Sequence, residues 1–313
     1  MSHVLSADQF KDPESIMSLV REAEEIRENA PRQRFPDKTV VHLFYEPSTR
    51  TSCSFQAAAH RLGCNVISLN DKASSAEKGE SLEDTIRTVA CYGDAIVLRH
   101  PDKGSAFKAA SVSKVPVLNA GDGNGEHPTQ ALLDIYTIHR ELRVDLQSSD
   151  RDYLNITFVG DLKNSRTVHS LILMLSQFPQ MNFVCISPPS LELPDDIVNC
   201  VQMRQNRECI SMNAMRLRDA ICFYSDVLYM TRIQKERFES VEEYDATMAR
   251  IDRYTLTPEL MTLAKPKMIV MHPLPRLQEI SVEVDADPRA AYFRQVENGL
   301  YMRMAILQRC FLQ

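Results

Sequence analysis

The stretch that decides the fold is Val40-Val41-His42-Leu43-Phe44-Tyr45-Glu46-Pro47-Ser48-Thr49-Arg50-Thr51. Its first six residues form an apolar, β-type run, which stops before Pro47. Apolar residues then recur at helical spacing, and Gly63 stands where such a helix would stop. The stretch therefore predicts a strand, a turn and a helix in direct succession.

The start of this predicted helix is suited to phosphate. Free backbone N–H groups and the positive end of the helix dipole gather at such a position. Hydroxyl groups and a bidentate guanidinium add donors for the phosphate oxygens, and they belong to Ser48, Thr49, Arg50 and Thr51. Taken alone, the same residues describe a capped helix with a solvent-facing arginine equally well, so the rest of the chain must decide.

Length and composition describe a globular protein of about two domains. The chain has 313 residues, 44% of them hydrophobic and 25% charged, and its net charge of −6 argues against general affinity for nucleic acid or anionic membranes. No run is long enough to span a bilayer. The eight cysteines are scattered without a Cys-x-x-Cys pair, which favours reduced thiols over disulfides or zinc. We therefore expect a cytoplasmic protein without a metal or cofactor.

Short apolar runs alternate with helical patterns along the whole chain. The predicted strands are 40–45, 65–69, 95–99, 115–119, 155–160, 182–187, 226–230 and 267–271. The predicted helices are 51–62, 81–92, 105–112, 128–142, 165–178, 195–204, 258–264 and about 288–312. This alternation predicts an α/β protein of two domains, each a parallel sheet flanked by helices, with the active-site cleft between them. Residues 143–152 are predicted to join the domains, and 205–224 fit either a strand or a helix.

Arginines recur immediately after the predicted strands of both halves: Arg50, Arg99, Arg166 and Arg232. Open parallel sheets bind ligands beyond the carboxyl ends of their strands. A single arginine in such a place is usually a solvated surface residue, and His127 alone would suit a helix start. An acidic chain that repeats the arrangement four times is predicted to bind anions.

Five blocks in the chain resemble the signature of aspartate carbamoyltransferases: FYEPSTRTS (44–52), RHP (99–101), GEHPTQ (125–130), TRIQKER (231–237) and HPLPR (272–276). The resemblance extends over essentially the whole chain. The segment DPRAAYFRQ (287–295) is similar to the domain at the end of the multifunctional animal pyrimidine-synthesis protein. It implies a carbamoyl phosphate-binding domain at 1–142, completed by the helix at 288–313, and an aspartate-binding domain at 143–287.

The resemblance also implies a reaction and a role for each site residue. The family joins carbamoyl phosphate to L-aspartate, giving N-carbamoyl-L-aspartate and phosphate. The residues implied to bind carbamoyl phosphate are Ser48, Thr49, Arg50, Thr51, Ser74, Arg99, His127, Gln130 and the carbonyls of Leu274 and Pro275. Those implied for aspartate are Lys78, Arg166, Arg232 and Gln234, and those implied in catalysis are Arg50, Thr51, Lys78, Arg99 and His127. Ser74 and Lys78 are implied to reach the neighbouring subunit's site in a homotrimer.

Direct attack by the substrate amine is the simplest mechanism, because no nucleophile stands beside an activating base. Aligning the substrates could lower the barrier by about 7–11 kcal/mol. The resemblance implies that Thr51, Arg99 and His127 polarise the carbonyl and stabilise the oxyanion. We expect the departing phosphate to accept the amine proton and neutral His127 to donate a hydrogen bond.

Two other functions stay open, and one residue departs from the family pattern. An ornithine carbamoyltransferase would have cysteine where this chain has Pro273, and a non-catalytic trimeric scaffold should have lost phosphate-site residues. The family usually has glycine where this chain has Ser165, and since a serine can cap the helix that starts there, we expect the change to be tolerated. Tethering to carbamoyl phosphate synthetase and dihydroorotase is also implied. The sequence shows no nucleotide-effector site.

Overall fold

The computed structural model describes residues 3–31, 33–70 and 79–312. The chain divides into two compact units, Met1–Tyr136 with Glu297–Gln313, and Thr137–Val296. Each unit contains one sheet whose strands are all parallel and are flanked by helices, which confirms the predicted class. No helix among the described residues has the length and apolar character needed to cross a membrane.

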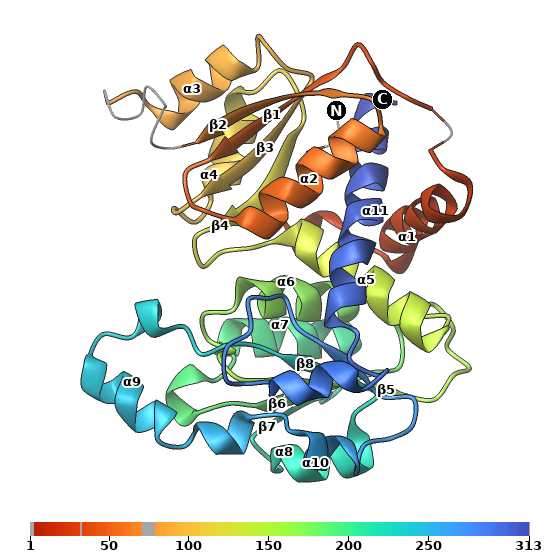
Figure 1. Cartoon of the computed structure of the whole chain (residues 1–313), viewed down its shortest axis with the longest axis vertical. Helices are drawn as coiled ribbons and strands as arrows, with labels where there is room; N and C mark the ends of the chain where they lie inside the picture. The colour runs from red at the N-terminus through yellow and green to blue at the C-terminus, as the bar shows by residue number, and fades with distance from the viewer. Residues whose placement is uncertain (1–2, 32, 71–78, 313) are drawn as a thin grey trace. The chain divides into compact units, whose positions relative to one another are not determined.

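The first unit is built on a four-stranded sheet in the order β2-β1-β3-β4. Its strands are β1 (Thr39–Phe44), β2 (Asn65–Asn70), β3 (Ala95–His100) and β4 (Val117–Asp122). Its helices are α1 (Pro13–Asn29), α2 (Thr49–Arg61), α3 (Leu82–Val89) and α4 (Ser105–Val112), with the start of α5 (Pro128–Leu142) and the end of α11 (Tyr292–Phe311). Figure 1 shows α2 lying across one face of this sheet.

Strand alternation explains how this sheet is covered on both faces. Val41 and Leu43 of β1 belong to a buried cluster with residues of α3 and α4. The intervening His42 points to the opposite face, where its ring lies 6.3 Å from the ring of Phe55 in α2. The two faces of β1 therefore pack against different helices.

The second unit is built on a five-stranded sheet in the order β7-β6-β5-β8-β9. Its strands are β5 (Leu154–Val159), β6 (Met181–Ile186), β7 (Ile210–Met212), β8 (Val227–Met230) and β9 (Ile269–Met271). Its helices are α6 (Arg166–Leu175), α7 (Asp195–Gln205), α8 (Leu217–Asp219), α9 (Val241–Met248) and α10 (Pro258–Met261). The chain also has 3₁₀ turns at Ala7–Gln9, Pro189–Leu191, Lys235–Arg237, Ile251–Tyr254 and Val282–Ala286, and a π-helical turn at Ala220–Tyr224.

Two helices were not predicted, and one segment that the sequence left open is now assigned. Helix α1 was not predicted, although Pro13 opens it and the Asp12 side chain accepts the Ser15 N–H at its start. Helix α9 was not predicted either, and it has no buried residues that would mark a helical face. The ambiguous residues 205–224 form β7, α8 and the π-helical turn. The bounds predicted for α4 and α5 are those observed.

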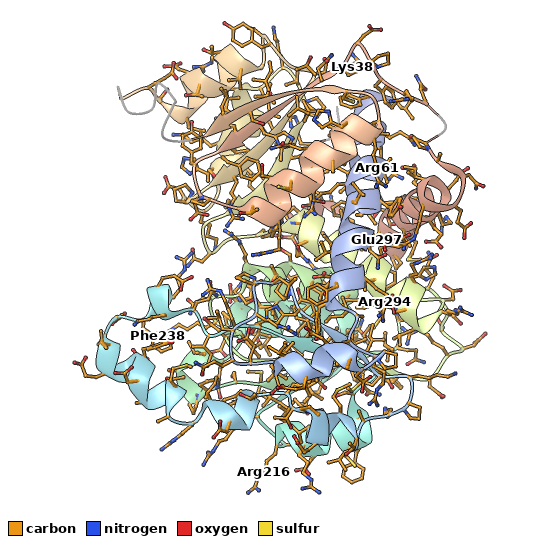
Figure 2. The ribbon with its side chains drawn as sticks, in the orientation of Figure 1. Lys38, Arg61, Arg216, Phe238, Arg294 and Glu297 are labelled. Carbon is orange, nitrogen blue, oxygen red and sulfur yellow. The ribbon has the colours of Figure 1, made fainter. Side chains whose placement is uncertain are left out.

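Helix α11 is bonded separately within each unit. Glu297 and Arg294 are both labelled on this helix in Figure 2. In the first unit, Glu297 pairs with Arg27 of α1 at 2.9 Å. In the second unit, Arg294 pairs with Glu141 of α5 at 2.7 Å. The helix is therefore held by charge-assisted hydrogen bonds on both sides of the boundary at 296–297.

Candidate active site

In the first unit, the carboxyl ends of three neighbouring strands meet at one edge of the sheet. Leu98 of β3 lies opposite Leu43 of β1 on one side and Asn119 of β4 on the other. Since the strands are parallel, the residues that follow them emerge side by side. The start of α2, Arg99 near the end of β3 and the loop 123–127 therefore lie at this edge, and the sequence predicted that these segments act together.

The start of α2 offers backbone donors and hydroxyl groups. Ser48 occupies the N-cap position with an extended backbone, and its side chain makes no capping hydrogen bond. Thr49 and Arg50 are exposed, whereas Thr51 is buried with 7% of its surface accessible. The N-terminal N–H groups of α2 are therefore not closed by the side chain of their own N-cap residue, as an anion site requires.

Arg99 is held in place by Ala120 of strand β4 and by Glu46, which follows β1. Its Nη1 donates to the Ala120 carbonyl at 3.1 Å, and its Nη2 lies 3.4 Å from the Glu46 carboxylate. Its own carbonyl accepts the Tyr45 N–H at 2.9 Å. Sequence reasoning did not single out Glu46, although it lies within the resembling block and directly follows the predicted strand.

The loop before α5 is shaped by a buried carboxylate. Asp122 accepts the Gly104 N–H at 2.8 Å and the Glu126 N–H at 2.7 Å. Gly123 has φ +56°, and a Cβ there would lie 2.2 Å from the Pro101 carbonyl oxygen, so only glycine fits. The loop places His127 directly before α5, where its side chain is buried and only 4% exposed.

His127 and Gln130 lie within one turn of each other at the start of α5. The Nδ1 atom of His127 is 3.5 Å from the Thr129 hydroxyl. The Gln130 amide donates to the Asp134 carboxylate at 2.8 Å. That contact engages the amide nitrogen of Gln130, whereas its side-chain carbonyl oxygen is the group that can accept a hydrogen bond from an amide.

The second unit brings β5 and β8 together, with Val159 opposite Met230. The turn after β5 passes directly against the residue after β8. Gly160 has φ +113°, and a Cβ there would lie 2.2 Å from the Thr231 carbonyl oxygen. This close approach places the segments that carry Arg166 and Arg232 after neighbouring strand ends.

The polar residues after β5 and β8 contact one another. Asp161 is fully buried, and burial raises its pKa above the usual range while hydrogen bonds from Asn164 oppose that shift. Its carboxylate lies 3.4 Å from the Gln234 amide nitrogen. Arg232 forms a two-pronged ion pair with Glu236, four residues further on. Asp161 and Glu236 were missed from sequence, although the i, i+4 spacing of Arg232 and Glu236 was a readable signal.

Arg166 is the first residue of α6 and is partly buried. The capping role suggested for Ser165 is met in position only. Ser165 does occupy the N-cap position, but its side chain makes no cap bond. Its hydroxyl lies 3.1 Å from the Thr167 hydroxyl instead, because a second hydroxyl is in reach at the helix start.

The segment after β9 carries Leu274 and Pro275, joined by a cis peptide bond. Leu274 is partly buried and Pro275 is exposed. The predicted site residues Ser74 and Lys78 lie outside the described residues. Within the described part of the chain, no three His, Cys, Asp or Glu side chains are grouped so that they could hold a metal ion.

Two family models match the chain. The carbamoyl-P binding domain of aspartate/ornithine carbamoyltransferase matches residues 2–140, and the Asp/Orn binding domain of the same family matches residues 152–310.

Named relatives match along nearly the whole chain. The multifunctional protein CAD of Squalus acanthias is 48% identical over 97% of this chain, which spans only 13% of that protein. The chloroplastic aspartate carbamoyltransferase of Arabidopsis thaliana is 44% identical over 98% of this chain and 77% of the relative.

Solved structures agree with these matches. Aspartate transcarbamoylase from Trypanosoma cruzi, in complex with N-(phosphonacetyl)-L-aspartic acid, matches with a TM-score of 0.89 and 43% identity. That match covers 98% of this chain and 94% of the solved one. The catalytic subunit of M. jannaschii aspartate transcarbamoylase matches with a TM-score of 0.87 and 43% identity, over 99% and 98%. The chain belongs to the aspartate/ornithine carbamoyltransferase family.

Proposed function

We propose that this chain transfers the carbamoyl group of carbamoyl phosphate to the amine of L-aspartate. The products are N-carbamoyl-L-aspartate and phosphate, and the reaction is the second step of de novo pyrimidine biosynthesis. The observation that carries this function is the strand-end edge of the first unit, where α2 follows β1, Arg99 lies near the end of β3 before His100, and His127 follows β4. Solved aspartate transcarbamoylases with carbamoyl phosphate and aspartate bound are similar to this chain throughout.

The first unit would bind carbamoyl phosphate. Backbone N–H groups and side chains at the start of α2 bind the phosphate oxygens, from Ser48 to Thr51. Arg99 bridges the phosphate and the carbonyl oxygen. Thr51, Arg99 and His127 then stabilise the negative charge that develops on that oxygen during attack.

The second unit would bind aspartate. Arg166 and Arg232 suit the two carboxylates of the substrate, since a guanidinium donates two parallel hydrogen bonds to a carboxylate. Gln234 supplies a further amide donor. Glu236 holds the guanidinium of Arg232 in one orientation before substrate arrives, which reduces the entropy lost on binding. Because Arg166 and Arg232 are both cations, the site should prefer a substrate with two carboxylates over ornithine, which carries a second amine.

The reaction needs no covalent enzyme intermediate. The aspartate amine attacks the carbamoyl carbon, a C–N bond forms and the C–O bond to phosphate breaks. Phosphate leaves with the electron pair and accepts the amine proton, while neutral His127 donates a hydrogen bond to the carbonyl oxygen. Gln130 and the carbonyls of Leu274 and Pro275 orient the carbamoyl amide.

The working form would be a homotrimer in which Ser74 and Lys78 act in the neighbouring subunit's site. The chain would also be tethered to carbamoyl phosphate synthetase and dihydroorotase, as its similarity to multifunctional relatives suggests. The eight cysteines are free thiols, which supports a reducing compartment such as the cytoplasm.

A steady-state assay for carbamoyl-aspartate tests this function. The samples are wild type, Arg50→Ala, Lys78→Ala and an equimolar mixture of the two variants after subunit exchange. The exposed Arg216→Ala variant is the control for loss of a positive charge. Wild-type turnover with L-aspartate but not ornithine, loss in each variant and partial recovery on mixing are expected. An inactive wild type that still assembles would favour the scaffold alternative, and turnover with ornithine would favour the other branch of the family.

A further inference from the structure

Two buried titratable side chains lie in the segment after β9, and neither takes part in the proposed mechanism. His272 and Glu279 are only 1% and 4% exposed. The Nε2 atom of His272 lies 2.8 Å from the Glu279 carboxylate. The hydrogen bond to His272 also keeps the pKa of Glu279 below its usual range, against the opposing effect of burial. A buried pair of this kind restrains the chain between its two members.

The hydrogen bonds define which nitrogen of His272 carries the proton. The Leu274 N–H donates to Nδ1 at 2.7 Å, so Nδ1 must be an acceptor. The ring proton is then on Nε2, where it is donated to Glu279. The backbone N–H of His272 itself donates to the Gln295 side chain at 2.9 Å.

Glu279 closes the other side of the loop. The Leu277 N–H donates to both of its carboxylate oxygens, at 3.1 Å each. The loop between His272 and Glu279 is therefore bonded at Leu274 and at Leu277, the residues on either side of Pro275 and Arg276. Two backbone N–H groups and one ring proton are all satisfied by these two side chains.

The restrained residue Leu274 has φ +55°, a left-handed conformation that costs energy for any side chain with a Cβ. Such a conformation persists only where neighbouring contacts hold it. Within the described residues, no hydrogen bond occupies the carbonyl oxygens of Leu274 and Pro275. The loop thus holds two carbonyl groups that can accept hydrogen bonds from a ligand.

We propose that His272 and Glu279 are positioning residues that hold the Leu274 and Pro275 carbonyls as acceptors for the carbamoyl –NH₂ group, and so determine the preference for a carbamoyl donor over an acetyl donor. This inference rests on the proposed function. Acetyl phosphate has a methyl group in place of the amide nitrogen and cannot donate to these carbonyls. A site built to hydrogen-bond a substrate N–H discriminates strongly against the analogue that lacks it.

Acetyl phosphate is therefore the probe for this inference. In the acetyl reaction the aspartate amine forms a C–N bond to the acetyl carbon and the C–O bond to phosphate breaks. Phosphate leaves with the electron pair and the amine proton, giving N-acetyl-L-aspartate. Both donors use the same phosphate and oxyanion contacts, so the ratio of their kcat/KM values isolates the contacts to the amide.

The experiment measures kcat/KM for both donors with wild type, Glu279→Ala, Glu279→Gln and His272→Asn. In Glu279→Ala we expect about a tenfold to hundredfold loss with carbamoyl phosphate and less than about a threefold change with acetyl phosphate. Glu279→Gln should keep most of the wild-type ratio of kcat/KM values for the two donors. The single side-chain oxygen of glutamine can replace Oε1, the oxygen of Glu279 that contacts His272 as well as Leu277. The exposed Glu283→Ala, in the same segment, is the matched control.

The His272→Asn variant keeps an acceptor near Leu274 but cannot reach Glu279, so its donor ratio should fall by an intermediate factor. If Glu279→Ala does not fold, the donor ratio of His272→Asn tests the proposal in its place. Equal losses for both donors, or an unchanged ratio in folded variants, would show that the pair only stabilises the unit. A wild type that forms no carbamoyl-aspartate would overturn the proposed function itself, and this inference with it.

Discussion

The most direct physical consequence of the structure concerns His42, whose ring lies in the apolar layer between β1 and α2. The side chain is 1% exposed, and its neighbours include the rings of Phe44 and Phe55 at 5.9 and 6.3 Å. Neither ring nitrogen has a hydrogen-bond partner among the residues that the structure describes. Burial lowers the pKa of His42 to about 4, and the charge of His60 acts in the same direction.

The sign of the effect follows from proton linkage. At pH 7.5 the imidazole is neutral in both the folded and the unfolded chain. Below pH 6.5 the unfolded chain binds a proton that the folded chain binds only near pH 4. The free energy of unfolding therefore decreases as the pH is lowered from 6.5 toward 4. The shift from 6.5 to about 4 corresponds to a loss of about 2 kcal/mol at pH 5 and about 3 kcal/mol below pH 4.

The comparison of wild type with His42→Leu isolates this contribution. Leucine fills a similar volume without a titratable group, so the stability difference between variant and wild type should grow by about 2 kcal/mol from pH 7.5 to pH 5. Urea denaturation at fixed protein concentration measures it, with the m-value as a check on two-state behaviour. The exposed His60→Asn is the control and should retain most of the wild-type slope. Parallel pH profiles for His42→Leu and wild type would refute the reasoning.

Three further predictions concern other described residues. His127→Ala should lower kcat by about a hundredfold to a thousandfold while leaving inhibition by phosphate nearly unchanged, and loss of phosphate inhibition would contradict the assigned role. Glu236→Gln should raise KM for aspartate about threefold to tenfold, because Arg232 loses its charged partner, with KM for carbamoyl phosphate unaltered in the same assay. Arg303→Met should destabilise the chain by about 3–5 kcal/mol in denaturant titrations, since the Asp134 carboxylate loses a buried cation, and an unchanged midpoint would argue against that pairing.

Arg303 also illustrates a contact that sequence spacing cannot reveal. Its guanidinium lies over the Phe55 ring at 5.0 Å and donates to the Ser54 hydroxyl at 2.8 Å. These partners come from a helix about 250 residues earlier in the chain. The burial of Arg303 and its electrostatic partner Asp134 depend on how α2, α5 and α11 pack together within the first unit.

Sequence reasoning performed best where local chemistry dominates. The bounds of α4 and α5 were predicted correctly because glycine and proline mark their starts and a clear apolar period follows. It missed α9, which has no buried face, and it left open the structure of β7, a three-residue strand of partly buried residues at the edge of the sheet. Periodicity is informative only when one face of an element is buried.

The sequence by itself determined the α/β class, the residues that follow each strand and the family, because these depend on residue type and order along the chain. Only the tertiary structure decided which strand ends are neighbours, and so which predicted residues stand together within each unit. It also decided the partners of Arg99, Gln234 and His272. Burial and hydrogen bonding depend on what surrounds a side chain in space, so the tautomer of His272 and the lowered pKa of His42 could not be read from the order of residues.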